Sequence, residues 1–300
     1  MSPLKWREGL CPNPDSEVGH RFLEHPVRIA RTSAQLRRDA LWVRKVDGEL
    51  SEFGATVRGH GGVVTGSTSP KKETTMKLLL TSGGVTNPSI RRSLVAALGK
   101  PIEEATALCI PTAQWGHQMC TPDSVRRFVV DGDEATMTGL GWASVGVLEL
   151  TALPTVGEGR WVPWVRDADV LLVDGGDATY LARWVQESGL ADLLPELSDT
   201  VWVGVSAGSM VMTPRIGDDF VSWPGAESDR TLGLVDFSIF PHLDHEMMPE
   251  NTLPEARRWA ADLGGPAYAL DDQSALVVVD GSVEVVSEGQ WHHFPDVGNN

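Results

Sequence analysis

The sequence predicts an α/β protein with a mostly parallel sheet, helices on both of its faces and an antiparallel edge late in the chain. Short apolar runs, most of them with β-branched residues, alternate with segments whose apolar residues have helical spacing. Such alternation is typical of βαβ units, in which parallel strands are buried between helices. Near the end of the chain, two short apolar runs are joined by Asp280 and Gly281, a pair that favours a tight hairpin turn.

The parallel strands are predicted from five apolar runs, at 78–81, 107–110, 145–150, 170–173 and 201–205. After residue 232 the pattern changes. There we expect a strand over 234–240, a helix near 253–263, and the hairpin strands 275–279 and 283–286.

Two of the helices between the strands have clear ends. The segment 88–98 begins with a proline, which suits the first turn of a helix, and stops before Gly99. The segment 178–188 can be capped by the Asp177 side chain and ends at Gly189. These ends support helices between the predicted strands.

Composition excludes several classes of protein. In 300 residues, 41% are apolar and 22% charged, which permits a sizeable core and excludes wholesale disorder. The net charge of -16 disfavours nucleic acid or an anionic membrane as a partner. The odd cysteine count (Cys11, Cys109 and Cys120), without a CxxC pair, supports neither a disulfide framework nor a thiolate zinc site. With no apolar stretch long enough for a spanning helix and no signal-like N-terminus, we expect a cytoplasmic protein.

The mean charge hides two unlike parts. Residues 1–75 contain 12 lysines and arginines against 9 acidic residues, whereas residues 76–300 contain 13 against 32. The first part ends in a run rich in Gly, Ser, Thr and Pro at 58–75, which favours a flexible linker. We therefore expect a poorly ordered basic extension and linker over 1–75 and one folded domain over 76–300.

The strongest local motif follows the strand at 201–205. Gly204 and Gly208 flank Ser206 in the pattern G-x-S-x-G, and helical residues come next. In a strand–turn–helix context this pattern predicts a nucleophile elbow, which exposes the serine hydroxyl above the carboxyl edge of the sheet. The backbone N–H of Ala207 would then point to where an oxyanion develops.

A serine nucleophile needs a base, and His242 is the candidate because it follows the predicted strand 234–240 at the sheet edge where ligands collect. His245 could instead form a metal pair with His242, but no convincing third ligand accompanies them. His292 and His293 near the C-terminus are more typical of solvated polar residues.

Two pairs of acids can orient the base. Asp218 and Asp219 follow the serine by 12 and 13 residues, and Asp271 and Asp272 follow the apolar stretch 267–270. Paired acids on a turn are often only solvated, so the residues leave the acid open.

A second glycine-rich turn follows the strand at 170–173. Gly175 and Gly176 would let backbone N–H groups approach a ligand without an intervening Cβ. A plain turn into a helix capped by Asp177 would also use glycine, so both interpretations stay open.

Several motifs, in order, resemble peptidase family S51, the group of aspartyl dipeptidases and cyanophycinases. They are LLLTSGG at 78–84, DVLLVDGGDATYL at 169–181, GVSAGS at 204–209, IFPHLDH at 239–245 and ALDDQSALVV at 269–278. The resemblance covers about 225 residues from Met76 and excludes the first 75. It implies a fold similar to class I glutamine amidotransferases, with serine in place of cysteine at the elbow, and a serine peptidase domain over 76–300.

The resemblance also implies roles for residues. Ser206 would be the nucleophile and His242 the general base. Asp219, with Asp218 as a competitor, resembles the acid often assigned between them, and Asp272 resembles a later acidic position that could orient the histidine instead. The remaining implied residues are Gly175, Gly176 and Ala207 as oxyanion amides, and Asp177 and Arg257 as substrate contacts.

The implied partner is a small peptide, with Asp-X dipeptides as one substrate class, and neither a metal nor an organic cofactor is implied. Ser209 and Met210 depart from the Ala-Asn pair common after the elbow in family dipeptidases. A homodimer is left open. The alternatives are an α/β-hydrolase esterase, whose base would be His292 or His293, and a non-catalytic ligand-binding protein on the same scaffold.

Overall fold

The computed structural model describes residues 76–130 and 137–295, so the expected extension and linker at 1–75 lie outside the described residues. The strands are β1 (Lys77–Thr81), β2 (Thr106–Ile110), β3 (Ser144–Val147), β4 (Val170–Val173), β5 (Val201–Val205), β6 (Ser238–Phe240), β7 (Ala267–Leu270), β8 (Ser274–Val279), β9 (Ser282–Ser287) and β10 (Trp291–Phe294).

The α-helices are α1 (Pro88–Leu98), α2 (Pro122–Val130), α3 (Leu153–Val156), α4 (Glu158–Arg166), α5 (Ala178–Glu187), α6 (Leu190–Leu193), α7 (Ala207–Met210) and α8 (Leu253–Leu263). Short 3-10 helices occur at Ile102–Glu104, Thr112–Gly116, Leu150–Ala152, Leu194–Glu196 and Asp218–Phe220. No helix among the described residues is long and apolar enough to cross a bilayer.

Seven strands form the main sheet, in the order β3-β2-β4-β5-β1-β8-β9. The five strands from β3 to β1 run parallel, whereas β8 pairs antiparallel with β1 and with β9. The late hairpin therefore forms the antiparallel edge, and the predicted fold class is confirmed. β1, the first strand, lies between the parallel and antiparallel parts.

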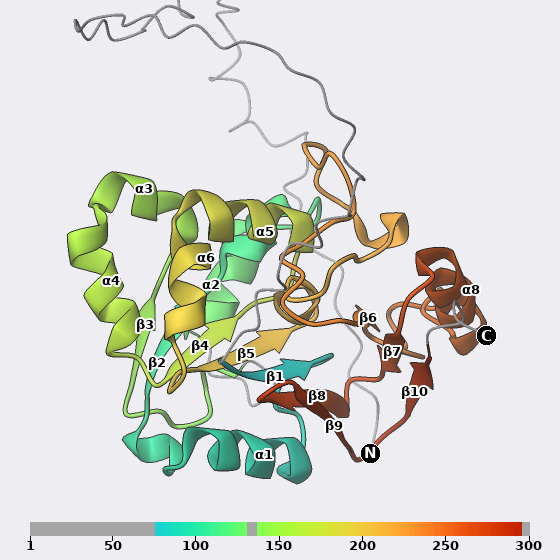
Figure 1. Cartoon of the computed structure of the whole chain (residues 1–300), viewed down its shortest axis with the longest axis horizontal. Helices are drawn as coiled ribbons and strands as arrows, with labels where there is room; N and C mark the ends of the chain where they lie inside the picture. The colour runs from blue at the N-terminus through green and yellow to red at the C-terminus, as the bar shows by residue number, and fades with distance from the viewer. Residues whose placement is uncertain (1–75, 131–136, 296–300) are drawn as a thin grey trace, which may run out of the picture. The chain divides into compact units, whose positions relative to one another are not determined.

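Helices cover both faces of this sheet, with α1 on one side and α3 to α6 on the other (Figure 1). Alternate residues of one strand enter different cores, because successive side chains point to opposite faces. In β1, Leu79 packs with Ile90 and Leu94 of α1, while Leu78 and Leu80 belong to the core beneath the other helices. All three leucines are almost fully buried, as expected of a strand covered on both faces.

A second, three-stranded sheet, in the order β10-β7-β6, was not predicted. Its strands have only three or four residues, too short for periodicity to separate them from loops. Of the predicted strand over 234–240, only Ser238–Phe240 forms a strand. This sheet packs with α8 through Phe240 and Trp259, whose rings meet edge to face, and lies beyond the antiparallel edge of the main sheet in Figure 1.

The elbow depends on close backbone packing between α7 and the sheet. A Cβ on Gly208 would lie 2.3 Å from the Val173 carbonyl oxygen, and one on Gly204 would lie 2.3 Å from the Gly208 carbonyl oxygen. The Trp202 indole also donates a hydrogen bond to that Gly208 oxygen, at 2.8 Å. The glycines of G-x-S-x-G therefore let α7 start directly against β4 and β5.

We expect Gly208→Ala to lower the free energy of unfolding by about 1–3 kcal/mol, because the added methyl must displace backbone atoms. Gly159→Ala is the matched control: Gly159 is exposed in α4, no atom lies within 4 Å of the position that an alanine methyl would take, and alanine favours a helix. Urea unfolding of both variants measures the difference. Equal stability of the two variants would contradict this account of the elbow.

Candidate active site

The order of the sheet brings three segments distant in sequence to one edge. Thr81 at the end of β1 pairs with Val205 of β5, so the next residues, Ser82 and Ser206, emerge side by side. On its other side β1 pairs with β8, and the Ser82 N–H donates to the Ser274 carbonyl at 3.3 Å. The turn before β8, which carries Asp272, therefore reaches the same place.

Ser206 occupies a strained backbone conformation, with φ 51° and ψ -114°. A positive φ is uncommon for a residue with a Cβ and costs free energy that the surrounding structure must offset. The Ser206 N–H donates to the carbonyl oxygens of Thr81 and Ser82, each at 3.1 Å, and α7 begins at the next residue. This is the geometry of a nucleophile elbow.

His242 is held by a carboxylate. Its Nδ1 lies 2.7 Å from Asp272 Oδ1, and its backbone also has a positive φ of 56°. An ionised carboxylate only accepts hydrogen bonds, so Nδ1 carries the hydrogen and Nε2 is left as the basic nitrogen. Ser206 and His242 are thus both held in backbone conformations that non-glycine residues rarely adopt.

Asp272 is surrounded by donors. Burial acts to raise its pKa, but the hydrogen bond and charge of His242, the Ser82 hydroxyl at 2.9 Å and the charge of His245 together lower that pKa below its ordinary value. His245 Nε2 lies 3.4 Å from Asp272 Oδ2, and its Nδ1 accepts the Met247 N–H. Both histidines that were considered as a metal pair therefore face one carboxylate.

The structure brings Asp272, and not Asp219, to His242. Asp218 and Asp219 lie exposed in the 3-10 helix Asp218–Phe220. The Asp219 carboxylate pairs with Arg258 of α8 at 3.3 Å, and both side chains are more than half exposed. Of the acids left open by the sequence, Asp272 contacts the imidazole, whereas Asp219 forms a surface ion pair.

The three amides expected to bind an oxyanion differ in their partners. The Gly175 N–H donates to Asp174 Oδ1 at 2.7 Å. Gly176 has a φ of 138° and packs so closely on Ala113 that a Cβ would lie 2.2 Å from its carbonyl oxygen. Within the part of the chain that the structure describes, the N–H groups of Gly176 and Ala207 have no hydrogen-bond partner. Two of the three amides therefore have an N–H without a partner in this part of the chain.

Asp177, expected to contact substrate, is instead fully buried and saturated with hydrogen bonds. One carboxylate oxygen accepts hydrogen bonds from the Tyr180 N–H and the Thr179 hydroxyl, and Asp177 thereby caps α5, as predicted. The other accepts from the N–H groups of Ser222 and Trp223, at 2.7 Å each. The Asp177 side chain therefore joins α5 to the loop at 221–223 and has no exposed surface for a substrate.

The other expected residues lie at the surface of the C-terminal part. Arg257 is exposed on α8, and no ion pair engages it among the described residues. His292 and His293 belong to β10, where the His293 ring stacks on Tyr268 with centroids 4.6 Å apart. Neither of these histidines contacts the elbow or a carboxylate among the described contacts.

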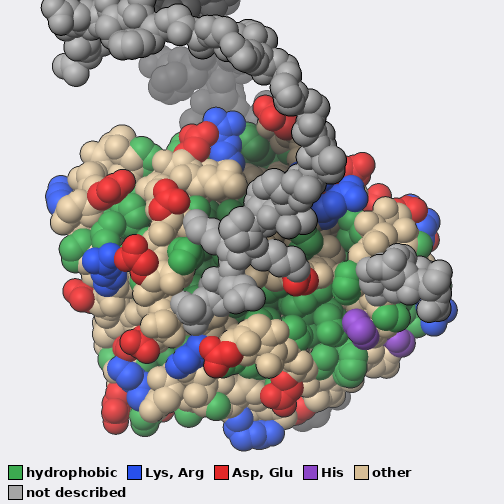
Figure 2. Space-filling model, viewed as in Figure 1, with side chains coloured by type: hydrophobic (Ala, Val, Ile, Leu, Met, Phe, Trp, Pro, Cys, Tyr) green, Lys and Arg blue, Asp and Glu red, His purple; other side chains and the backbone are tan. Residues whose placement is uncertain are grey.

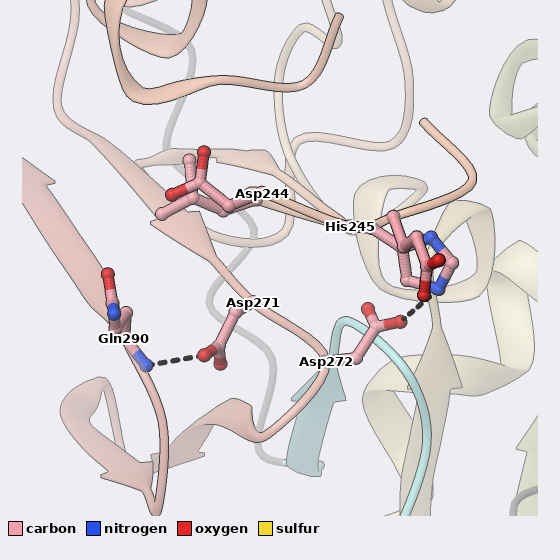
Figure 3. A pocket seen from close by; sticks show the side chains of 7 residues that line it. Asp244, His245, Asp271, Asp272 and Gln290 are labelled. Carbon is pink, nitrogen blue, oxygen red and sulfur yellow. Dashed lines mark hydrogen bonds and ion pairs between the residues drawn. The ribbon is translucent and has the colours of Figure 1, made fainter. Parts of the chain in front are cut away.

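A cavity of about 350 Å³ adjoins the His–Asp pair and is lined by Leu243, Asp244, His245, Glu246, Asp271, Asp272 and Gln290. Figure 3 shows the Asp272 carboxylate pointing toward His245, while Asp271 turns away toward Gln290. Asp271 is bound there by the Gln290 N–H and the Ser274 hydroxyl. The lining is strongly acidic, although acidic and basic side chains are intermixed on the face shown in Figure 2.

Asp174, which follows β4 and is 6% exposed, was not predicted as a site residue. Burial raises its pKa to about 7, against the hydrogen bonds from Gln114 Nε2 and the Gly175 N–H, which lower it. The sequence does contain a hint of this residue: an aspartate directly after a fully apolar strand is unusual, because carboxylates are rarely buried. Its partner Gln114 comes from the 3-10 helix Thr112–Gly116, which no pattern connects to it.

A serine at a strained strand–helix turn, with a carboxylate-bound imidazole at the same sheet edge, is an arrangement of serine hydrolases. Comparison with known proteins agrees: peptidase family S51 matches residues 78–286. Because that match spans more than half of the chain, the protein belongs to peptidase family S51 and is a serine peptidase. No curated protein matches the chain.

Two solved structures have a similar fold. One is a protein assigned as a peptidase E from Listeria monocytogenes EGD-e, with a TM-score of 0.53, 19% identity, and coverage of 71% of this chain and 99% of that chain. The other is a peptidase from an acI-B1 Actinobacterium, with a TM-score of 0.52, 19% identity, and coverage of 74% and 92%. At this identity they show the shared fold alone.

The raised pKa of Asp174 predicts a pH dependence of stability. Between about pH 4 and pH 7 the folded protein keeps a proton that the unfolded chain releases, so the free energy of unfolding falls as the pH rises. An asparagine does not ionise, so we expect Asp174→Asn to remove this decrease in stability with pH. Above pH 7 the free energy of unfolding of the variant should exceed that of the wild type by up to about 4 kcal/mol. The asparagine oxygen still accepts the Gly175 N–H. Its NH₂ group donates to the Gln114 side-chain oxygen once the Gln114 amide has rotated by half a turn.

Urea unfolding at several pH values measures the effect. Asp169→Asn is the control of opposite sign, because Lys100 and Thr106 lower the pKa of Asp169 against its burial, so this carboxylate stabilises when ionised. An unchanged pH slope in Asp174→Asn would overturn the assignment of a buried, protonated Asp174.

Proposed function

We propose that the protein hydrolyses small peptides by a Ser-His-Asp mechanism in which Ser206, His242 and Asp272 form the triad. The observation that carries this proposal is the 2.7 Å contact between His242 Nδ1 and Asp272 Oδ1, at the sheet edge where the strained Ser206 emerges. Asp272 replaces Asp219 in this role, because Asp219 pairs with Arg258 at the surface.

In the acylation step, the Ser206 hydroxyl attacks the scissile carbonyl while His242 Nε2 takes its proton. The imidazolium then protonates the leaving amine as the C–N bond breaks, which leaves an acyl ester on Ser206. Water attacks that ester by the same route, and the proton returns to Ser206 as the acid product departs. Asp272 holds the tautomer and stabilises the imidazolium through both steps.

The N–H groups of Gly176 and Ala207 are the proposed donors to the oxyanion. Two observations support them: neither has another partner among the described residues, and a Cβ on the adjoining Gly175 would lie 3.4 Å from Ser206 Cβ. Preorganised backbone donors of this kind stabilise the tetrahedral intermediate without reorganising during the reaction. The Gly175 N–H already donates to Asp174 Oδ1, so we assign Gly175 a role in the turn and not as an oxyanion donor.

A small substrate is supported by the cavity beside Asp272, whose volume of about 350 Å³ suits a small ligand. Its acidic lining attracts the ammonium group of a peptide N-terminus and repels a substrate carboxylate at that place. The Asp-X preference implied by the family therefore depends on a cation elsewhere, and Arg257 is the residue we propose for it.

We expect Ser206→Ala, His242→Ala and Asp272→Asn each to lower kcat/KM by about 10,000-fold or more, as loss of a triad member does. Asp219→Asn is the matched control, and we expect less than about a threefold change because it loses only a surface ion pair. Rates of dipeptide hydrolysis and thermal unfolding are measured together for all four. Activity that survives Asp272→Asn but not Asp219→Asn would refute the assignment of the acid.

A dipeptide panel tests the preference at the amino end. If Arg257 contacts a substrate aspartate, kcat/KM for Asp-Leu exceeds that for Asn-Leu by about tenfold or more, or about 1.4 kcal/mol. We expect Arg257→Gln to abolish this ratio and Arg258→Gln to keep it, since Arg258 already pairs with Glu255. Preferential hydrolysis of Lys-Leu would instead show that the acidic cavity selects a cationic residue.

A further inference from the structure

Ser82 lies at the one point where the elements that carry Ser206, His242 and Asp272 meet. It follows β1, which pairs with β5 on one side and with β8 on the other. It is fully buried, with 0% of its surface exposed, although it is a polar residue just beyond the end of a strand. A buried polar group is costly unless each of its hydrogen-bonding atoms has a partner.

Every polar atom of Ser82 is paired, and the partners include all three proposed triad residues. Its carbonyl oxygen accepts the Ser206 N–H at 3.1 Å. Its hydroxyl accepts the His242 N–H at 2.7 Å and donates to Asp272 Oδ1 at 2.9 Å. Backbone and side chain thus connect the nucleophile, the base and the acid through one residue.

We propose that Ser82 is a positioning residue that sets the distance and orientation between the His242 imidazole and the Asp272 carboxylate. This inference rests on the proposed triad. A hydroxyl can do this because it both accepts and donates. It accepts the backbone N–H of His242 and donates to Asp272 Oδ1, the oxygen that the His242 ring contacts. Asp272 Oδ1 therefore receives two hydrogen bonds, which orient it more narrowly than one.

The surroundings of Ser82 support the same role. A Cβ on the next residue, Gly83, would lie 2.6 Å from Asp272 Cβ, so the loop after β1 packs directly against the acid. The Thr86 hydroxyl of this loop donates to the Asp272 carbonyl at 2.6 Å. The strained backbone of His242, with a φ of 56°, also needs a restraint from outside. The hydrogen bond from the His242 N–H to the Ser82 hydroxyl provides one.

The test compares Ser82→Ala with Ser188→Ala in the full-length chain. Ser188 is the matched control because it is also buried, and its hydroxyl likewise donates to a carbonyl, of Val185, and accepts an N–H, of Leu190. For Ser82→Ala we expect kcat to fall about tenfold to a hundredfold with KM nearly unchanged, as expected of a small misplacement of reacting groups. Ser188→Ala keeps the wild-type kcat.

Two further readouts separate positioning from a loss of folded protein. Without the Ser82 hydroxyl, the Asp272 carboxylate loses one donor and its fixed orientation against the imidazole, so the pH of the acidic limb of the kcat/KM profile changes. The low-field proton resonance of His242 Nδ1–H, assigned by its loss in His242→Gln, should shift in Ser82→Ala. Ser82→Cys, which keeps a weak donor and acceptor of similar size, should recover part of the rate.

The outcomes are distinct. A wild-type kcat, pH limb and Nδ1–H resonance in Ser82→Ala would overturn the inference while leaving the triad intact. If Ser82→Ala does not fold, the same three measurements on Ser82→Cys decide: wild-type values for all three overturn the inference, and a lowered kcat with a shifted limb and resonance supports it. Full activity of Ser206→Ala would overturn the proposed function instead, and the proton resonance still tests the contact between Ser82 and the His–Asp pair.

Discussion

The place of β1 between β5 and β8 is the constraint on which the site depends. Its parallel pairing with β5 aligns Ser82 with Ser206, and its antiparallel pairing with β8 brings the turn that carries Asp272 to the same edge. A purely parallel sheet would place only the carboxyl ends of strands here. The change of direction at β1 adds the amino end of β8, and with it the acid.

Backbone strain at this edge is offset by tight packing around it. Ser206 and His242 both have positive φ values. The Ser206 N–H donates to the carbonyl oxygens of Thr81 and Ser82, and the His242 N–H donates to the Ser82 hydroxyl. Gly204 and Gly208 remove the side chains that would keep α7 from the sheet. The strain therefore persists because neighbouring strands and α7 leave the two residues no alternative conformation.

The site holds carboxyl groups in two contrasting environments. Asp272 receives hydrogen bonds from an imidazole and a hydroxyl, and its pKa is lowered despite burial. Asp174, buried beside the Gly175–Gly176 turn, has its pKa raised to about 7. In a domain with a large excess of acidic residues, the balance between burial and local donors decides which carboxyl group is charged. Because its pKa is about 7, Asp174 carries only part of a negative charge near neutral pH, beside the proposed oxyanion donors.

The sequence by itself determined the strand–helix alternation, the elbow at Ser206 and the antiparallel hairpin, because these features rest on local periodicity and turn chemistry. It also marked His242 and Asp272, but could not choose Asp272 over Asp219, since both are acids on turns. The second sheet was not predicted because its strands have only three or four residues. Only the tertiary structure decided that Asp177, already predicted as a cap, is fully buried by its bond to Ser222, that Arg258 pairs with Asp219, and that Ser82 belongs to the site. Such contacts depend on which strands become neighbours, and that is settled by packing of the whole sheet.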